Sequence, residues 1–458
     1  MTTQLVTAQA APSITPAGFL ASDRRRSWGR VARGLEYIAA PRFQDEAVRA
    51  CEDAVGADMT LLAGGLGRAY GDSGLNGGGA VIDMRALDRV LAFDPQSGVL
   101  RAEAGLSLDQ AIRRVTPHGW FLPTTPGTRF VTLGGAVAND VHGKNHHRSG
   151  PLGCWVRKLG LWRSDRGLLE LSPEQEPALF AATLGGMGLT GAILWVELQL
   201  VRIASAYLDE ETIAFGRLDE FFALARDSEA GFEHTVAWID CTARDGVRGL
   251  FSRGNWRDDG RYTLHAERPR RTLPFDLPNA ALNPLTLKLF NARYYKRGRS
   301  RPRFSVEHYS SALYPLDAIG QWNRLYGARG FYQYQCVVPP EPAPDAIAAL
   351  LEQIVRAGQG SFLAVLKTFG AKASPGLMSF PMPGATLALD FPNLGDKTHA
   401  LFGGLDDIVG QAGGRLYPAK DGRMPPAMLR AGYPNLERFA QLRDPNFSSS
   451  FWRRSFHG

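Results

Sequence analysis

Cysteine is scarce in this chain and falls into no recognised pattern. The four cysteines among 458 residues, Cys51, Cys154, Cys241 and Cys336, are widely separated and form no C-x-x-C pair. This spacing excludes a disulfide framework and a cysteine-rich zinc site. A reducing, cytoplasmic compartment fits the composition best.

Long apolar runs are missing as well. The most apolar stretch, residues 184–201, is interrupted by several glycines and by Glu197. It therefore predicts a buried strand rather than a membrane span. Residues 1–20 have neither a basic n-region nor a continuous apolar core, so we expect a short irregular tail and no signal peptide.

The familiar nucleotide-binding motifs are also absent. Gly65 and Gly67 begin a G-x-G, but Tyr70 stands where the third glycine of a dinucleotide fingerprint belongs. Gly143 and Lys144 do not complete a P-loop, because asparagine follows them and alanine stands five residues before the glycine. Any phosphate site must therefore have another architecture.

Histidine spacing gives no convincing metal motif. His142 and His146 are four residues apart, but the glutamate of an H-E-x-x-H motif is lacking. We expect no metal, and a structural or phosphate-facing role for His146 and His147.

Charge is unbalanced, with a net charge of +7 and a pI near 9.3, although 44% hydrophobic and 21% charged residues are ordinary for a globular chain of two or three domains. Six basic residues crowd into residues 293–303, RYYKRGRSRPR. No nucleic-acid motif accompanies them, so we expect no nucleic-acid partner. The segment reads as a solvated basic loop or, next to the apolar residues 282–290, as a contact for anionic lipid headgroups.

Two glycine-rich stretches organise the rest of the sequence. Residues 122–147, LPTTPGTRFVTLGGAVANDVHGKNHH, indicate a strand or loop that runs into a helix start at Gly134 and Gly135. Such a start binds anions through free amides and the helix dipole, although glycines there also suit a plain tight turn. Residues 63–79, AGGLGRAYGDSGLNGGG, form another loop of the same kind; because it comes earlier in the chain, it is the first glycine-rich loop. Two such loops could hold one dinucleotide between them.

The order of elements predicts an α+β protein. Helical spacing is present at residues 44–55 and 107–115, and strand patterns occur at 61–63, 80–84, 99–104 and 189–201. After residue 204 the stretches HTVAWIDCT, YQYQCVVPP and TLALDFP alternate as in an antiparallel sheet with one covered face.

Longer segments carry a family resemblance. Besides the two loops, these are SWGR (27–30), GGMGLTGAI (185–193), AWID (237–240), QWNRLYG (321–327), FYQYQCVVP (331–339), SFLAVLKTFG (361–370), SFPMPG (379–384) and GGRLYPAKD (413–421). They resemble flavoenzymes of the vanillyl-alcohol-oxidase and para-cresol-methylhydroxylase type, and within that group the polyprenylphosphoryl-ribose 2′-oxidases. The resemblance implies a two-part FAD-binding domain, residues 15–203 completed by the C-terminal segment 413–458, and a substrate-binding domain at 204–412 built on an antiparallel sheet.

The resemblance also implies how FAD is held. Many relatives attach the flavin covalently to a histidine of the first loop, and Arg68 stands at that position here. An arginine cannot form that bond, so FAD is expected to be non-covalent. The residues carried over as FAD contacts are Gly65, Leu66, Gly67, Arg68, Ala69, Tyr70, Gly71, Asp72, Ser73, Gly127, Thr132, Leu133, Gly134, Gly135, Asn139, Asp140, Val141, His142, Ile193 and Tyr417.

The implied chemistry is oxidation of a secondary alcohol, which removes a hydride from carbon and a proton from oxygen. Lys420 is the first candidate to take the proton, since burial would lower its pKa; it could instead pair with Asp421 or stabilise reduced flavin. The expected catalytic residues are Lys420, Tyr70, Gln335 and His142, and the expected substrate contacts are Lys367, Gln335, Tyr314, Trp238 and Lys420.

The implied substrate is a polyprenylphosphoryl-β-D-ribose, oxidised at the 2′-hydroxyl as the first half of epimerisation to the arabinose form used in cell-wall synthesis. A separate NAD(P)H-dependent keto-sugar reductase would complete the epimerisation, and a quinone is one candidate acceptor for the flavin electrons. The enzyme would then work in the cytoplasm, with peripheral contact at the inner membrane face. The alternatives are an oxidase of a soluble alditol or aldonolactone, and a non-catalytic flavin-binding partner.

One departure is informative. Mycobacterial members carry a cysteine, the target of nitroaromatic inhibitors, where this chain has Ala388. That covalent trapping should be absent here, while the oxidation itself does not need the thiol.

Overall fold

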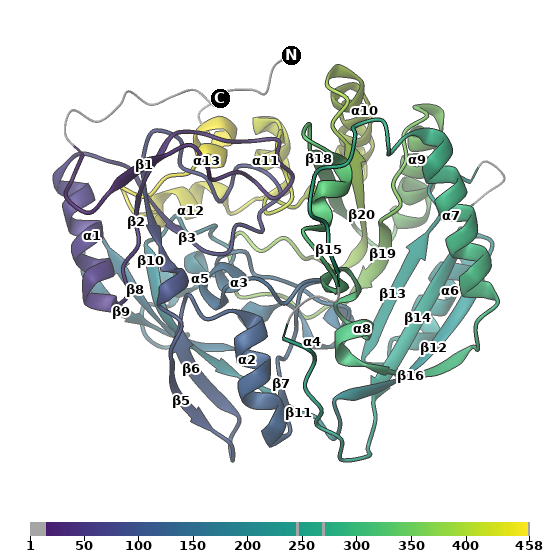
Figure 1. Ribbon diagram of the computed structural model, residues 1–458, viewed down its shortest axis with the longest axis horizontal. Coiled ribbons are helices and arrows are strands. Elements are labelled where there is room, and N and C mark those ends of the chain that lie inside the picture. The colour runs from purple at the N-terminus through teal and green to yellow at the C-terminus, as the bar shows by residue number, and fades with distance from the viewer. Residues whose placement is uncertain (1–14, 244–246, 268–270, 457–458) are drawn as a thin grey trace.

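The computed structural model describes residues 15–243, 247–267 and 271–456, which form two lobes of mixed helices and sheets (Figure 1). The fold is α+β, as the sequence predicts. Our expectation for the first residues of the chain falls largely on 1–14, outside the described residues. In the described part, no helix is both long enough and apolar enough to cross a membrane.

A small sheet begins the first lobe. Its strands are β1 (Leu20–Ser22), β2 (Glu36–Ala39), β4 (Ala80–Asp83) and β3 (Leu61–Gly64), in that order. The last three are parallel, and β1 is antiparallel to β2. Helix α1 (Gln44–Gly56) buries Ala47, Cys51 and Ala54 against this sheet. A single 3-10 turn, η1 (Met84–Ala86), follows β4.

A five-stranded antiparallel sheet completes this lobe. Its order is β5 (Val90–Asp94), β6 (Val99–Glu103), β10 (Ala192–Gln199), β8 (Val156–Arg163) and β9 (Gly167–Leu171). The accompanying helices are α2 (Leu108–Val115), α3 (Leu133–Ala138), α4 (His146–Ser149) and α5 (Pro177–Thr183), with turns η2 (Thr116–His118) and η3 (Leu152–Trp155). Helix α2 starts sharply because Ser107 and Gln110 form a capping box. Strands β7 (Trp120–Phe121) and β11 (Val201–Arg202) pair beside it.

The second lobe contains an antiparallel sheet of eight strands. Their order is β16 (Phe304–His308), β12 (Tyr207–Phe215), β14 (Gly249–Trp256), β13 (His234–Ile239), β19 (Ala364–Phe369), β20 (Gly384–Pro392), β18 (Phe331–Val338) and β21 (Arg415–Leu416). Helices α6 (Leu218–Ser228), α9 (Ala343–Arg356) and α10 (Asp396–Gln411) share the apolar core on one face. Helix α7 (Pro284–Arg299) lies in front of the other face (Figure 1).

Strand alternation decides which side chains face which side of this sheet. Ala237, Leu366 and Leu387 enter the apolar core. Their neighbours Trp238 and Lys367 line a cavity on the opposite face. The predicted alternation of these strands is therefore confirmed.

Short elements connect the lobes. They are α8 (Tyr309–Ala312), η4 (Pro315–Ala318), η5 (Trp322–Tyr326) and the parallel pair β15 (Arg271–Thr272) and β17 (Ile319–Gly320).

The C-terminal helices α11 (Pro426–Gly432), α12 (Leu436–Leu442) and α13 (Ser450–Phe456) lie beside the N-terminal sheet (Figure 1). Phe447 forms a β-bridge with Leu61, and Arg454 forms ion pairs with Asp72 and Asp421. The last part of the chain thus packs onto its first part.

One expectation about local structure is wrong. The basic segment 293–303 was expected to be a loop, but residues 293–299 form the second half of helix α7. Asn283 caps the first turn through the amides of Leu285 and Thr286, and proline occupies the first helical position. This strong start propagates the helix into the basic segment.

Candidate active site

A cavity of about 1070 Å³ lies between the two lobes. The residues that line it come from the loop after β3, from helix α3, from the face of the eight-stranded sheet opposite the apolar core, from the C-terminal half of α7, and from residues 417–420. Pockets for drug-sized ligands fall at roughly 300–1,000 Å³. This cavity therefore has room for a dinucleotide and a second ligand together.

The first glycine-rich loop offers unused backbone donors. Strand β3 ends at Gly64, and Gly67 adopts a left-handed conformation with φ of 65°. In the described part of the chain, no backbone acceptor receives the amides of residues 66–69, whereas the amide of Tyr70 is bonded to the Ala419 carbonyl. A run of free amides at a cavity wall is a ready cradle for an anion.

Helix α3 differs from the prediction. Its first amides were expected to be free for a phosphate, but the amide of Leu133 donates to Leu106 O, that of Gly134 to Ala104 O and that of Gly135 to the side chain of Thr132. The helix has only six residues, and its start is fastened to the strand that leads into α2. The glycines serve close packing here, since a Cβ on Gly134 would lie 2.8 Å from the Ala104 Cβ.

The two glycine-rich loops lie side by side in the lining of the cavity. A Cβ on Gly65 would lie 2.4 Å from Thr132 Oγ1, so only glycine permits this approach. A Cβ on Gly71 would lie 1.4 Å from the Asp421 carbonyl oxygen, which brings the C-terminal segment against the same loop.

Most residues predicted to contact FAD line the cavity. They are Gly65, Leu66, Gly67, Arg68, Ala69, Tyr70, Ser73, Gly127, Thr132, Gly134, Gly135, Asn139, Val141, His142, Ile193 and Tyr417. Gly71, Asp72, Leu133 and Asp140 are not part of its lining. Asp72 is ion-paired with Arg454, and Asp140 accepts hydrogen bonds from Ser374, Ser379 and the amide of Gly153, so both carboxylates hold segments together behind the wall.

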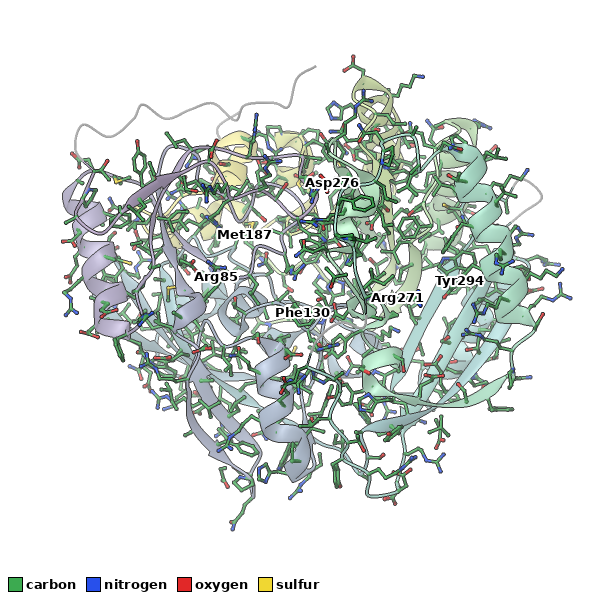
Figure 2. All side chains as sticks on the ribbon, in the orientation of Figure 1. Arg85, Phe130, Met187, Arg271, Asp276 and Tyr294 are labelled. Carbon is green, nitrogen blue, oxygen red and sulfur yellow. The ribbon has the colours of Figure 1, made fainter. Side chains whose placement is uncertain are left out.

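Arg68 is held against the cavity wall by an aromatic ring. Its guanidinium carbon lies 3.9 Å from the Trp28 ring centroid, and its Nε donates to the carbonyl of Phe130, which Figure 2 labels between the two lobes. Burial lowers the pKa of Arg68. The guanidinium is nevertheless a cation beside the free amides.

The four residues predicted to be catalytic all line the cavity, and they contact one another in two pairs. Gln335 Nε2 donates to His142 Nε2 at 3.1 Å, and Lys420 Nζ lies 4.0 Å from the Tyr70 ring centroid. Burial holds the pKa of His142 well below its usual range, reinforced by the charges of Lys367, His146 and Lys420. His142 is therefore a neutral acceptor and orienting group at neutral pH.

Lys420 is the group best placed to take a proton. Burial lowers its pKa, and the negative charge of Asp390 partly opposes that shift. The alternative pairing with Asp421 finds no support, because the amides of Arg423 and Met424 donate to Oδ1 of Asp421 and Arg454 donates to Oδ2. The Lys420 amine instead faces the cavity.

The predicted substrate contacts divide into two groups. Lys367, Gln335, Trp238 and Lys420 line the cavity. Burial and the charges of Lys144 and Lys420 lower the pKa of Lys367 to about 7, and its Nζ donates to the Gly143 carbonyl at 3.3 Å. Tyr314 does not line the cavity. It is fully buried behind the wall, where its hydroxyl is 2.7 Å from Thr125 Oγ1.

Other cavity residues were missed by the sequence analysis. Lys144, Glu210, His234 and Ser252 also line the cavity. Lys144 was considered only as part of a failed P-loop. Strand alternation around residues 207–215 and 249–256 would have placed Glu210 and Ser252 on one face, but not in a site.

The histidines gather without forming a metal centre. The described residues contain no group of three or more His, Cys, Asp or Glu side chains that could hold a metal ion. His146 packs against Phe369 with ring centroids 4.3 Å apart, and burial lowers its pKa to about 3. Neither ring nitrogen of His146 has a hydrogen-bond partner among the described residues.

Comparisons with known proteins agree with this geometry. Residues 35–172 match the FAD-binding domain family. Decaprenylphosphoryl-beta-D-ribose oxidase of Mycolicibacterium smegmatis is 36% identical over 451 residues, which cover 94% of this chain and 97% of the relative. An uncharacterized protein from the mprA 5′ region of Streptomyces coelicolor is 31% identical, covering 76% of this chain and 99% of that protein. L-gulonolactone oxidase of Mus musculus is 31% identical, but only over 27% of this chain and 28% of the relative. The chain thus belongs to the decaprenylphosphoryl-β-D-ribose oxidase family of FAD-dependent oxidoreductases.

Proposed function

We propose that this enzyme oxidises the 2′-hydroxyl of a polyprenylphosphoryl-β-D-ribose to the 2′-keto sugar, the first half of its epimerisation to the arabinose form used in cell-wall synthesis. The observation that carries the proposal is the arrangement of the cavity. Free amides and Arg68 line part of the cavity, and Lys420, Gln335, His142 and Tyr70 line the same cavity, with Gln335 bonded to His142 and Lys420 resting on the Tyr70 ring. The full-length similarity to a decaprenylphosphoryl-ribose oxidase supports the choice of substrate.

The cavity residues fit FAD. The amides of residues 66–69 and the Arg68 guanidinium would hold its diphosphate. The space next to Gly127 is open, since a Cβ added there would meet no atom of the described residues within 4 Å. When bound, FAD supplies the acceptor for the hydride that leaves the substrate carbon. Because Arg68 replaces the histidine of covalent relatives, the flavin is bound non-covalently and is released when the protein is denatured.

The protein residues handle the proton. As the C–H bond breaks, the neutral amine of Lys420 takes the proton of the 2′-hydroxyl, and the C–O bond becomes a carbonyl. Gln335 and Tyr70 orient the sugar hydroxyls. His142, neutral and held by Gln335, supplies a fixed polar group beside them.

The substrate phosphate belongs near Lys367. Its pKa of about 7 reflects the cost of burying a lone cation next to two other lysines. A phosphate would supply the missing counter-charge and return Lys367 to its charged form. Trp238 lies along the same wall and would pack against the sugar or the first prenyl unit.

We divide the chain accordingly into an FAD-binding domain made of residues 15–203 and 413–458, and a substrate-binding domain of residues 204–412. The bridge from Phe447 to Leu61 and the ion pair of Arg454 with Asp72 support this division. Strand β21, which pairs with β18, marks the passage between the two.

We also propose a cytoplasmic enzyme with peripheral contact at the inner membrane face. Leu285, Leu289 and Phe290 are exposed on α7, which also carries Arg297, a residue that lines the cavity. This combination suits a surface that meets anionic headgroups while a lipid substrate enters. A separate NAD(P)H-dependent reductase would take the keto sugar, and a quinone would reoxidise the flavin.

The decisive experiment is anaerobic bleaching of the bound flavin. The purified yellow protein is mixed with a short-chain polyprenylphosphoryl ribose, with xylitol and a sugar lactone in parallel. We expect bleaching by the lipid-linked ribose alone. Bleaching only by a soluble compound would overturn the proposal.

One observation favours a second candidate function. The partial match to L-gulonolactone oxidase, together with polar lining residues such as Glu210 and Ser252, is compatible with an oxidase of a soluble alditol or aldonolactone. That function predicts rapid bleaching by xylitol or the lactone, and peroxide release in air.

A further inference from the structure

A buried carboxyl group lies directly behind the proposed catalytic cluster. Asp390 stands on β20, two residues beyond Ala388, and therefore on the same face of the strand as that cavity residue. It pairs in register with Gln333 of β18 and is fully buried. It does not line the cavity, so it cannot touch the substrate directly.

The carboxyl group of Asp390 is only half satisfied. Oδ1 accepts a hydrogen bond of 2.5 Å from Gln333 Nε2. Oδ2 has no partner among the described residues. A buried acceptor left without a partner is costly, so its retention calls for an explanation.

Among the described residues, the amine of Lys420 also lacks a charged partner in direct contact. Within the described part of the chain, no hydrogen bond or ion pair holds its amine, which rests on the Tyr70 ring. Burial lowers the pKa of Lys420 and raises that of Asp390, and the charge of each residue opposes the shift of the other. Gln333 connects the two residues, because it donates to Asp390 and also interacts with the Tyr70 hydroxyl.

We propose that Asp390 is the buried counter-charge of Lys420 and a positioning residue for the oxidation, acting through Gln333, Tyr70 and Lys420 rather than by touching the substrate. The inference rests on the proposed role of Lys420. When Lys420 takes the substrate proton, the cavity gains a positive charge beside Lys367. The carboxylate of Asp390 offsets that charge without competing for the substrate.

The titratable groups around this pair come from several elements. Tyr70 and Arg68 approach from the first loop, Tyr326 from η5, Lys367 from β19 and His142 from the segment after α3. Both tyrosines have pKa values raised well above the ordinary value by burial, and the pKa of His142 lies well below its own. Near neutral pH, Lys420, Asp390 and Lys367 are therefore the members of this set that change charge.

The test measures the protonation of Lys420 itself. FAD-loaded protein is pulse-labelled with acetic anhydride at a series of pH values, and mass spectrometry follows acetylation of the peptide that contains Lys420. Asp390→Asn removes the negative charge, so the labelling midpoint should fall by about one pH unit or more. Glu307→Gln, a matched change at another acid of the cavity wall, should leave the midpoint unchanged. An unchanged midpoint in Asp390→Asn would overturn the proposal.

A second variant covers the case in which Asp390→Asn fails to fold. Gln333→Leu keeps the carboxyl group but removes its hydrogen-bond donor, so Asp390 becomes neutral more readily and the Lys420 midpoint should again fall. A midpoint equal to that of the unmodified protein would also overturn the inference. Because no substrate is present during labelling, this outcome is independent of whether the ribose lipid is the true substrate.

Discussion

Lys420 is the residue on which the proposed chemistry depends most directly. Replacing it with methionine keeps the side-chain volume but removes the proton acceptor. The rate of anaerobic flavin reduction should fall about 10²–10⁴-fold, the usual contribution of a positioned general base. Stopped-flow absorbance measures this rate, and the flavin content of the variant should be unchanged.

The pH dependence of this step follows from the same amine. Only neutral Lys420 accepts a proton, so the rate should rise with pH and level off above the Lys420 pKa, which burial places below the ordinary value of 10.5. In Lys420→Met this rising limb should disappear. Lys397→Met, at an exposed lysine, serves as the control and should keep both the rate of flavin reduction and its rise with pH. A full rate in Lys420→Met would contradict the mechanism.

Ala388 decides a different property of the cavity. It lines the cavity next to Gln335, its partner on the neighbouring strand, and carries no nucleophile, so a nitroaromatic inhibitor of the mycobacterial relatives should not add covalently to this enzyme. Ala388→Cys should create a protein that gains the inhibitor mass. Intact-protein mass spectrometry measures the gain. Cys336, on the same sheet but in the apolar core, should stay unmodified in both proteins.

Helix α13 acts at the scale of an element, because Arg454 fastens two parts of the site to it. The guanidinium bonds both Asp72, in the first glycine-rich loop, and Asp421, next to Lys420. Arg454→Ala leaves these two buried carboxylates without their cation. Loss of a buried partner costs about 3–5 kcal/mol. We expect a lower melting temperature and weaker retention of FAD on gel filtration.

A matched change on the neighbouring helix separates this effect from general surface damage. Arg438 lies on α12, is exposed and forms no ion pair with a described residue. Arg438→Ala should leave melting and flavin retention as they are. Equal behaviour of the two variants would show that Arg454 does not support the site.

Helix α7 is the element predicted to touch the membrane. Leu285 and Leu289 are 66% and 62% exposed, and Tyr294, labelled on this helix in Figure 2, continues the apolar surface towards the basic end. Leu285→Gln with Leu289→Gln should weaken binding to phosphatidylserine-containing vesicles at least about tenfold, since each buried leucine contributes about 1.5–3 kcal/mol. Co-sedimentation measures the binding.

The control for α7 is an equally exposed leucine elsewhere. Leu168 on β9 is 63% exposed, and Leu168→Gln should leave vesicle binding unchanged. Replacing Arg293, Lys296 and Arg297 with glutamine should reduce binding and its salt dependence. If neither set of α7 substitutions changes vesicle binding, α7 does not contact the membrane.

The sequence predicts elements well where local patterns dominate. The capping box of Ser107 and Gln110 marks the start of α2, and alternation marks β13, β18 and β20. It fails where distant segments meet. The amides of α3 are taken by the segment 104–106, and Tyr314 is drawn behind the wall by Thr125. Asp390 was missed for the same reason, since only the pairing of β18 with β20 brings it to Lys420.

At the scale of the whole molecule, the buried amine of Lys367 should lower the free energy of unfolding. The folded pKa of Lys367 is about 7, whereas an unfolded lysine titrates near 10.5. The unfolded state therefore binds more protons between these values, and stability rises with pH across that window; below pH 7 the full penalty applies. Lys367→Met should raise the free energy of unfolding at pH 7 by roughly 1–3 kcal/mol.

The stabilisation by Lys367→Met should shrink as the pH approaches 10, where an unfolded lysine also begins to lose its proton. Urea denaturation of FAD-free protein at pH 7 and pH 10 measures both values. The same variant should bind the phosphorylated substrate less tightly, which is the usual exchange of stability for function. A less stable Lys367→Met protein at pH 7 would contradict this account of the buried cation.

The contact between Gly71 and the Asp421 carbonyl also sets an order of events during synthesis. The first glycine-rich loop leaves the ribosome long before residues 419–421 and helix α13 exist. At about 5–20 residues per second, the first lobe waits roughly 20–70 s for the segment that closes its wall. Flavin capture must therefore be one of the last steps in the making of each molecule. Until then, the half-built cavity is open surface that a chaperone can recognise.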